Sequence, residues 1–171
     1  MKAESLPMDG RDVAPGSALW AGVQDLFAEY AECLDDDRLE EWPELFVEDC
    51  LYLVIPRENE ERGLPLAVVR CESRGFLRDR VVAVRDTAMY TPRYQRHVIG
   101  TARVSPQAGP GQVSARADYA VFQCFTDELP QVFSTGVYRA LVDVSGDRLR
   151  FAELRCVYDS TLVPNSIVRP L

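Results

Sequence analysis

From about residue 97 onward, apolar and polar residues alternate along the chain, and this pattern limits the possible folds more than any other feature. Alternation with a period of two is typical of β-strands that bury one face and expose the other. It predicts four strands, at 97–104, 112–125, 132–144 and 149–159. The connections between them are short and rich in turn-forming residues, so we expect neighbouring strands to pair as an antiparallel meander.

The first half of the chain has helical periodicity instead. Ser17 is a suitable N-cap, and apolar residues then recur at helical spacing as far as Leu34. Three aspartates at 35–37 end this helix. The pattern further predicts a short helix at 39–46, a buried strand at 50–55, a charged loop at 57–65, a short strand at 66–70 and a helix at 74–86.

Helices followed by a strongly bent meander predict an α+β fold, with a cone-shaped, curved antiparallel sheet and the N-terminal helices packed on its concave face. This layout resembles nuclear transport factor 2, ketosteroid isomerase and scytalone dehydratase, a resemblance of fold that leaves function open. We expect a single domain at 17–171. Residues 1–16 are polar and contain prolines and glycines, so we expect a flexible N-terminal tail.

Composition excludes several classes of function. The 171-residue chain has a net charge of −8 and no basic patch dense enough for nucleic-acid binding. No apolar run approaches the ~18 residues of a membrane span, and the N-terminus has no hydrophobic signal core. The five cysteines are odd in number and form no C-x-x-C pair. We therefore expect free thiols and a cytoplasmic protein.

His97 is the single histidine, and this count excludes whole mechanisms. A Rieske cluster needs two histidines beside two cysteines, and a non-haem iron facial triad also needs two histidines. Neither site can be built from this chain alone. We expect no catalytic, cofactor-binding or metal-binding residues on it.

The predicted helix at 74–86 carries an unusual set of arginines. On a helical wheel, four apolar residues share a sector that should face the core: Phe76, Leu77, Val81 and Val84. Arg80 falls within this sector and therefore needs a polar partner or a subunit contact. Three more arginines form a stripe beside it: Arg74, Arg78 and Arg85. The stripe is either a solvated charged face or a docking face for an acidic partner surface.

Three residues would suit acid–base catalysis in a cone-shaped cavity: Asp49, Tyr52 and His97. They support an alternative hypothesis, a stand-alone dehydratase or isomerase, and a small-ligand binding protein is another. A cavity lined by these polar groups would favour the alternatives, whereas a cavity filled by aromatic side chains would favour a structural protein. Five charged residues on the predicted strands are expected to pair across the sheet: Arg116, Asp118, Arg139, Glu153 and Arg155.

Six motifs together resemble one family, the small (β) subunits of multicomponent aromatic-ring-hydroxylating dioxygenases. They are E-W-P-x-L-F-x-E-D-C-x-Y at 41–52, R-E-N-x-E-R-G-L-P-L at 57–66, S-R-G-F-L-x-D-R at 73–80, Y-x-x-x-Y-x-R-H at 90–97, F-x-T-G-x-Y at 133–138 and V-Y-D-S at 157–160. The resemblance spans roughly residues 18–171. Within the family the chain is most similar to the subunits of salicylate, anthranilate and terephthalate oxygenases.

The resemblance implies a partner and a role. In this family the large (α) subunit carries a Rieske [2Fe-2S] cluster and a mononuclear iron, while the small subunit carries no cofactor and supports an α3β3 hexamer. It implies a non-catalytic structural subunit for the degradation of aromatic compounds, with small subunits associated as a trimer within the hexamer. The candidates for subunit contacts are Arg57, Arg62, Arg74, Arg78, Arg80 and Arg85.

Overall fold

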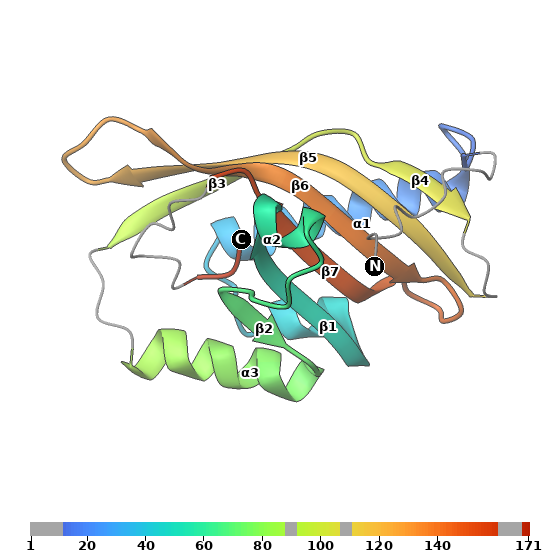
Figure 1. Cartoon of the computed structure of the whole chain (residues 1–171), viewed down its shortest axis with the longest axis horizontal. Coiled ribbons are helices and arrows are strands. Elements are labelled where there is room, and N and C mark those ends of the chain that lie inside the picture. Colours follow the sequence, from blue (N-terminus) through green and yellow to red (C-terminus); the bar gives the residue numbers. More distant parts are fainter. Residues whose placement is uncertain (1–11, 88–91, 107–110, 161–168) are drawn as a thin grey trace.

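The computed structural model describes residues 12–87, 92–106, 111–160 and 169–171, and Figure 1 shows a long curved sheet crossed by one helix. In chain order the elements are α1 (Ala18–Asp35), the 3₁₀ helix η1 (Trp42–Leu45), β1 (Phe46–Pro56), α2 (Arg57–Glu61), β2 (Val69–Cys71), α3 (Arg74–Val82), the π-helical turn η2 (Ala83–Thr87), β3 (Arg93–Ile99), β4 (Arg103–Pro106), β5 (Gln112–Phe125), β6 (Gln131–Asp143) and β7 (Arg150–Tyr158).

The predicted meander is present, with strand order β2-β1-β7-β6-β5-β3 and with β4 also paired to β5. The strand predicted at 97–104 is two strands, because the chain leaves the ladder at residues 100–102. There the side chain of Gln24 on α1 replaces a strand partner. Its Oε1 accepts from the Ala102 N–H at 2.9 Å, and its Nε2 donates to the Ala102 carbonyl at 3.1 Å.

The sheet is curved and largely antiparallel, as predicted, but one pair of strands departs from that arrangement. β1 lies parallel to β7, with Tyr52 opposite Leu154 and Val54 opposite Cys156, so the sheet is mixed. The reason is topological, because the first long strand of the chain is inserted beside the last one. The alternation of apolar and polar residues is the same whether a strand lies parallel or antiparallel to its neighbour, so it does not predict that β1 and β7 are parallel.

The predicted α+β fold, in which N-terminal helical structure packs on a curved sheet, is confirmed, and the sheet is not closed. The Ser17 hydroxyl accepts from the Trp20 N–H and caps α1, as predicted. The buried stripe of α1 packs on the sheet through Phe27 and Tyr30, whose rings lie 5.4–6.0 Å from those of Tyr138 and Phe151. Figure 1 shows that α3 instead lies at the side of the sheet, near β1 and β2.

Two local predictions need correction. The charged loop predicted at 57–65 begins with the one-turn helix α2, and the residue that caps its C-terminus, Arg62, pairs with Glu58 at 2.7 Å. The helix predicted at 74–86 is α-helical only to Val82 and continues as a π-helical turn. Its N-cap is Ser73, as predicted. Leu77 is buried, but Phe76, expected in the core, is 55% exposed.

The described start of the chain contacts β4, where the Val13 N–H donates to the Val104 carbonyl at 2.8 Å. Residues 1–11 of the predicted tail lie outside the described residues, and its flexibility stays a prediction. Among the helices described, none is both long enough and apolar enough to span a membrane.

Candidate functional site

The space between α1 and the sheet is filled by aromatic side chains. The rings of Tyr119 and Tyr138 stack at 4.2 Å, and Trp42 contacts Tyr52 with ring centroids 5.1 Å apart. Leu171 enters this interior and is fully buried. A filled interior is the outcome that the sequence analysis associated with a structural protein rather than with a cone-fold enzyme.

His97 is held by an aspartate that the sequence analysis did not single out. Asp35, at the end of α1, accepts from the His97 backbone N–H and lies 2.6 Å from its ring Nδ1. The side chain of Asp35 is 8% exposed, and that of His97 is fully buried. Nδ1 faces the Asp35 carboxylate, which can only accept a hydrogen bond, so this contact clamps α1 to β3. The acidic run at 35–37 was visible in the sequence, but its proximity to His97 depends on the fold.

The three residues of the enzyme hypothesis do not form one site. Asp49 lies exposed on β1, whereas Tyr52 and His97 are buried. The Tyr52 hydroxyl is already engaged, since it accepts from the Leu171 N–H at 2.9 Å. Asp49 is therefore separated from the two buried groups with which the enzyme hypothesis combined it.

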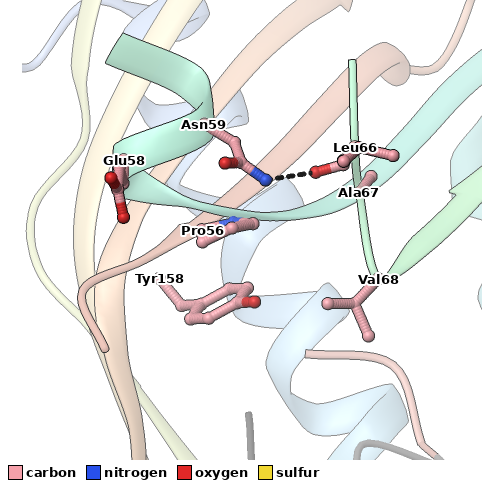
Figure 2. A pocket seen from close by; sticks show the side chains of 7 residues that line it. All are labelled: Pro56, Glu58, Asn59, Leu66, Ala67, Val68 and Tyr158. Atoms are coloured by element: carbon pink, nitrogen blue, oxygen red, sulfur yellow. Dashed lines mark hydrogen bonds between the residues drawn. The ribbon is translucent and has the colours of Figure 1, made fainter. Parts of the chain in front are cut away.

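Two hollows on the described surface lie elsewhere. Figure 2 shows one of about 320 Å³ between α2 and the 66–68 segment, walled by Tyr158 and bridged by the bond from Asn59 Nδ2 to the Leu66 carbonyl. The other, of about 440 Å³, lies between η2 and the start of β3 and is lined by Arg85, Arg93 and Tyr94, among others. Neither hollow is lined by Asp49, Tyr52 or His97.

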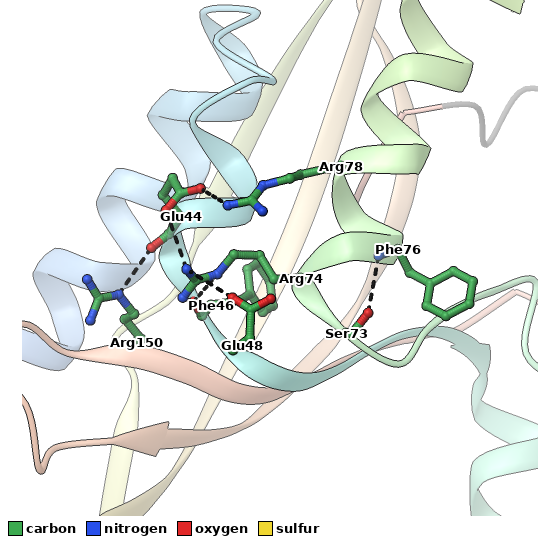
Figure 3. A network of polar contacts seen from close by, with 8 residues as sticks. All are labelled: Glu44, Phe46, Glu48, Ser73, Arg74, Phe76, Arg78 and Arg150. Carbon is green, nitrogen blue, oxygen red and sulfur yellow. Dashed lines mark hydrogen bonds and ion pairs between the residues drawn. The ribbon is translucent and has the colours of Figure 1, made fainter.

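The arginine stripe of α3 divides into structural and exposed members (Figure 3). Arg74 is 16% exposed and reaches under the helix, where its Nε donates to the Phe46 carbonyl at 3.0 Å and its Nη2 to the same oxygen. Its Nη1 lies 3.4 Å from Glu48. Arg78 is 55% exposed and pairs with Glu44 at 2.8 Å, which lowers the pKa of that carboxyl group.

Arg85 is also a structural residue. It binds Glu40 through Nε at 2.7 Å, and the side chain and carbonyl of Asp37 through its other nitrogens, both at 2.7 Å. These hydrogen bonds raise the pKa of Arg85. Asp37 also pairs with Arg169 at 2.7 Å. Arg85 therefore ties η2 to the turn after α1, and it is a weaker candidate for a subunit contact.

The three remaining candidates for subunit contacts are Arg57, Arg62 and Arg80, and each has a partner within this chain. Arg57 pairs with Asp159, which joins α2 to the end of β7, and Arg62 pairs with Glu58 on the surface. Arg80 is half-buried and has a partner, which agrees with its place beside the apolar sector of α3.

The prediction that the strand charges pair across the sheet was wrong. Four arginines stand in register on adjacent strands: Arg103 of β4, Arg116 of β5, Arg139 of β6 and Arg155 of β7. Like charges placed opposite each other destabilise a sheet, so counter-charges are needed. Glu60 of α2 supplies one, pairing with Arg139 at 3.3 Å and Arg155 at 3.2 Å. Asp118 and Glu153 pair instead with arginines of their own strands.

The cysteines and carboxylates do not suggest a metal site. All five cysteines are free thiols, as predicted. Across residues 12–87, 92–106, 111–160 and 169–171, no three histidine, cysteine, aspartate or glutamate side chains are grouped to hold an ion. With one histidine in the sequence, the residues present do not fit a Rieske cluster or a facial-triad iron.

Comparison with known proteins agrees with the motifs. Residues 18–155 match the family described as SnoaL-like domain. The small subunit of anthranilate 1,2-dioxygenase from Burkholderia cepacia is 34% identical over 152 residues, which cover 89% of this chain and 94% of that protein. A terephthalate 1,2-dioxygenase terminal oxygenase subunit (beta 2) from Comamonas is 32% identical over 145 residues, covering 84% and 93% respectively.

Solved structures agree as well. The β subunit of a protein assigned as an aromatic-ring-hydroxylating dioxygenase from Novosphingobium aromaticivorans is 43% identical, with a TM-score of 0.81, over 90% of this chain and 97% of that one. The fold, the motifs and these matches lead to one conclusion. The chain belongs to the SnoaL-like family and, within it, to the small (β) subunits of aromatic-ring-hydroxylating dioxygenases.

Proposed function

We propose that this chain is the non-catalytic structural subunit of a Rieske-type aromatic-ring-hydroxylating oxygenase, and that it holds large subunits together in an α3β3 hexamer. The observation that carries the proposal is the filled interior. Aromatic rings and Leu171 occupy the space in which a cone-fold enzyme would bind its substrate. His97, the most plausible general base, is buried and bound to Asp35.

The redox centres are proposed to lie on the large subunit. When bound there, the Rieske cluster and the mononuclear iron would supply electron transfer and oxygen chemistry. The role of the present chain is then positional. The relatives are small subunits of anthranilate and terephthalate dioxygenases, and this supports an aromatic carboxylate as the substrate of the assembled enzyme.

The outer side of α3 is the surface that best suits a contact with the large subunit. Phe76 and Val82 are each 55% exposed, although both are large and apolar, and Arg78 on the same helix is equally exposed. Figure 3 shows Phe76 directed away from the network that Arg74 and Arg78 form with Glu44. Exposed aromatic residues combined with arginine are typical of protein interfaces and of their energetic centres.

Co-expression with the large subunit tests the proposal. We expect a complex with the mass of a hexamer by light scattering, iron in that complex, and no iron retained by the present chain alone. Stoichiometric iron on the isolated chain would contradict the assignment of the cofactors. His97→Asn keeps a side-chain donor for Asp35, so turnover per iron should stay near the parent value. A drop of orders of magnitude in an intact hexamer would show that His97 is catalytic.

Substitutions on the outer side of α3 test whether this surface contacts the large subunit. Phe76→Ala should leave the melting temperature of the isolated chain nearly unchanged and should weaken assembly at low protein concentration. Leu129→Ala is the matched control, because Leu129 is 84% exposed but lies between β5 and β6, away from α3. If Phe76→Ala assembles as the parent does, α3 is not the contact surface.

A further inference from the structure

The hollow between α2 and residues 66–68 is walled by segments from distant parts of the chain. Pro56 ends β1, Asn59 lies on α2, and Tyr158 ends β7. The 66–68 segment closes the other side, and Asn59 Nδ2 holds it through a hydrogen bond of 2.8 Å to the Leu66 carbonyl. Figure 2 shows these walls around an open space, which has a volume of about 320 Å³. The hollow is therefore built by elements that the fold itself holds in place.

Tyr158 places a polar group at this hollow that the described chain does not use. The residue is only 3% exposed, and within the described residues its buried hydroxyl has no hydrogen-bond partner. In Figure 2 the hydroxyl borders the hollow and is directed toward Val68. Burial raises the pKa of Tyr158, so the group stays protonated and can donate. Buried donors are nearly always paired in folded proteins, and an acceptor that enters the hollow would pair this one.

The rim of the hollow exposes large apolar side chains. Leu66 is 71% exposed and Val68 is 45% exposed, and Leu64, just before them in the chain, is 43% exposed. A small-molecule site keeps most of its apolar lining inside the pocket, whereas an exposed apolar group beside a pocket is typical of a surface that another protein covers. A partner side chain in the hollow would bury this rim at the same time.

The charges on α2 add to the description of the partner. Glu58 lines the hollow and pairs with Arg62 at 2.7 Å, and Glu60 pairs with two arginines of the sheet. Glu61, the last residue of α2, is exposed and has no ion pair within the part of the chain that the structure describes. A basic residue of the partner would complement this negative charge.

The hollow continues the surface proposed for the large subunit. β2 is the edge strand of the sheet, and the chain runs from 66–68 through β2 directly into α3. Figure 1 shows α2, β2 and α3 grouped near β1, at the end of the sheet away from β3. A stable protein interface covers ~800 Å² of each partner. A large subunit on the outer side of α3 would therefore extend to neighbouring segments such as 66–68.

We propose that this hollow receives a side chain of the large subunit and so adds a second contact to the one on α3. The occupant is a large apolar side chain whose adjacent backbone carbonyl accepts from the Tyr158 hydroxyl. An arginine or lysine close to it in the large subunit pairs with Glu61. This contact rests on the proposed function, since it requires the large subunit, but it adds the hollow, the donor and the chemistry of the partner segment.

Tyr158→Phe tests the donor, because it removes the hydroxyl and keeps the ring. In the isolated chain the melting temperature should stay at or above the parent value, since the hydroxyl makes no hydrogen bond to the described residues. The complex with the co-expressed large subunit should dissociate at a roughly 3–10-fold higher concentration, measured by mass photometry over a dilution series. A complex as tight as that of the parent would show that no acceptor reaches Tyr158 and would overturn the proposal.

Two substitutions test the apolar fit. Ala67→Phe would place a ring in the hollow that Ala67 lines, and Leu66→Ala would remove the most exposed side chain of the rim. Both should leave the melting temperature of the isolated chain nearly unchanged and should weaken the complex by roughly 10-fold or more, as changes at the centre of an interface do. Leu129→Ala is again the matched control. If neither substitution weakens the complex, the large subunit does not occupy the hollow.

The charge has its own test in Glu61→Gln. This variant should weaken the complex a few-fold at low salt, and the difference from the parent should disappear at high salt because exposed charges are screened. A complex that is unaffected at low salt would contradict the basic residue assigned to the partner.

Hydrogen exchange measured by mass spectrometry distinguishes the possible occupants. Peptides that cover 57–68 should exchange more slowly in the complex than in the isolated chain. Equally slow exchange in a trimer of the isolated chain would assign the hollow to a second copy. A small molecule that the isolated chain retains in native mass spectrometry, and that Ala67→Phe releases, would make the hollow a ligand site. Either result would overturn the proposal.

The same measurement separates this contact from the proposed function. A hexamer in which 57–68 exchanges as it does in the isolated chain would refute the contact and leave the structural role of the subunit intact. The absence of any complex with the large subunit would refute both.

Discussion

Arg74 and Arg78 lie one turn apart on α3, and replacing each with alanine should have very different consequences. The sequence placed them in one stripe, but the structure gives only Arg74 a buried acceptor. The guanidinium of Arg74 joins α3 to the Phe46 carbonyl at the start of β1, and Phe46 itself is fully buried. Removing Arg74 leaves that carbonyl without its two side-chain donor bonds.

The size of each effect follows from burial. A hydrogen bond that involves a charged group contributes about 1.5–3 kcal/mol, and two bonds to one oxygen do not count twice. Arg74→Ala should therefore lower the unfolding free energy by about 2–3 kcal/mol. Arg78 pairs with Glu44 in the open, and an exposed pair contributes about 0–1 kcal/mol. For a chain of this length, 1 kcal/mol corresponds to about 2–4 °C in melting temperature.

Thermal unfolding of the isolated chain, followed by circular dichroism at one protein concentration, measures both variants. We expect a decrease of roughly 5–10 °C for Arg74→Ala and at most roughly 2–4 °C for Arg78→Ala. Arg74→Lys is the matched control, since it keeps the charge and loses the two-point donor, and it should fall between the parent and Arg74→Ala. Equal decreases for the two alanine variants would refute the assignment of Arg74 as the structural member.

Two further predictions concern backbone packing and titration. Gly136→Ala places a β-carbon 2.0 Å from the Val157 carbonyl oxygen, so urea unfolding should show a loss of roughly 3 kcal/mol in unfolding free energy. Gly75→Ala is the control, because a β-carbon on α3 has space there and the unfolding free energy should be unchanged or slightly raised. An equally small effect of Gly136→Ala would contradict the close approach of β6 and β7. Burial raises the pKa of Cys33 and Cys50 to about 11 from an ordinary value of 9.0. These thiols therefore ionise at a lower pH in the unfolded chain, and the unfolding free energy should fall as pH rises from about 9 to about 11. Identical urea unfolding curves at the two ends of this range would show that the thiols are not protected in the folded chain.

The family motifs acquire physical explanations from these contacts. Gly136 is the glycine of the F-x-T-G-x-Y motif, and any side chain there would overlap the backbone of β7. Ser73 and Arg74 of the S-R-G-F-L motif cap α3 and bind β1. The motif residues thus maintain the fold at its closest contacts, which explains how a sequence pattern could identify the family.

Helix α1 and the long strands were predictable because their signals are local. Strand β5 matches its predicted bounds, and its buried face from Val113 to Val121 follows the alternation read from the sequence. The single histidine likewise excluded Rieske and facial-triad sites on this chain, since a count of ligands needs no coordinates. Phe76 was predicted to be buried but is 55% exposed. A helical wheel shows which residues share the apolar side of a helix, but it does not show how much of that side the rest of the protein covers.

The sequence by itself therefore determined most of the helical and strand segments, the family, and the lack of enough histidines for a Rieske or facial-triad iron site on this chain. Tertiary structure alone decided that β1 runs parallel to β7, that Asp35 holds His97, and that Leu171 fills the interior. Each of these contacts joins residues far apart in the chain. Periodicity reports only which side of an element is buried, whereas the partner of that side depends on how the elements pack together.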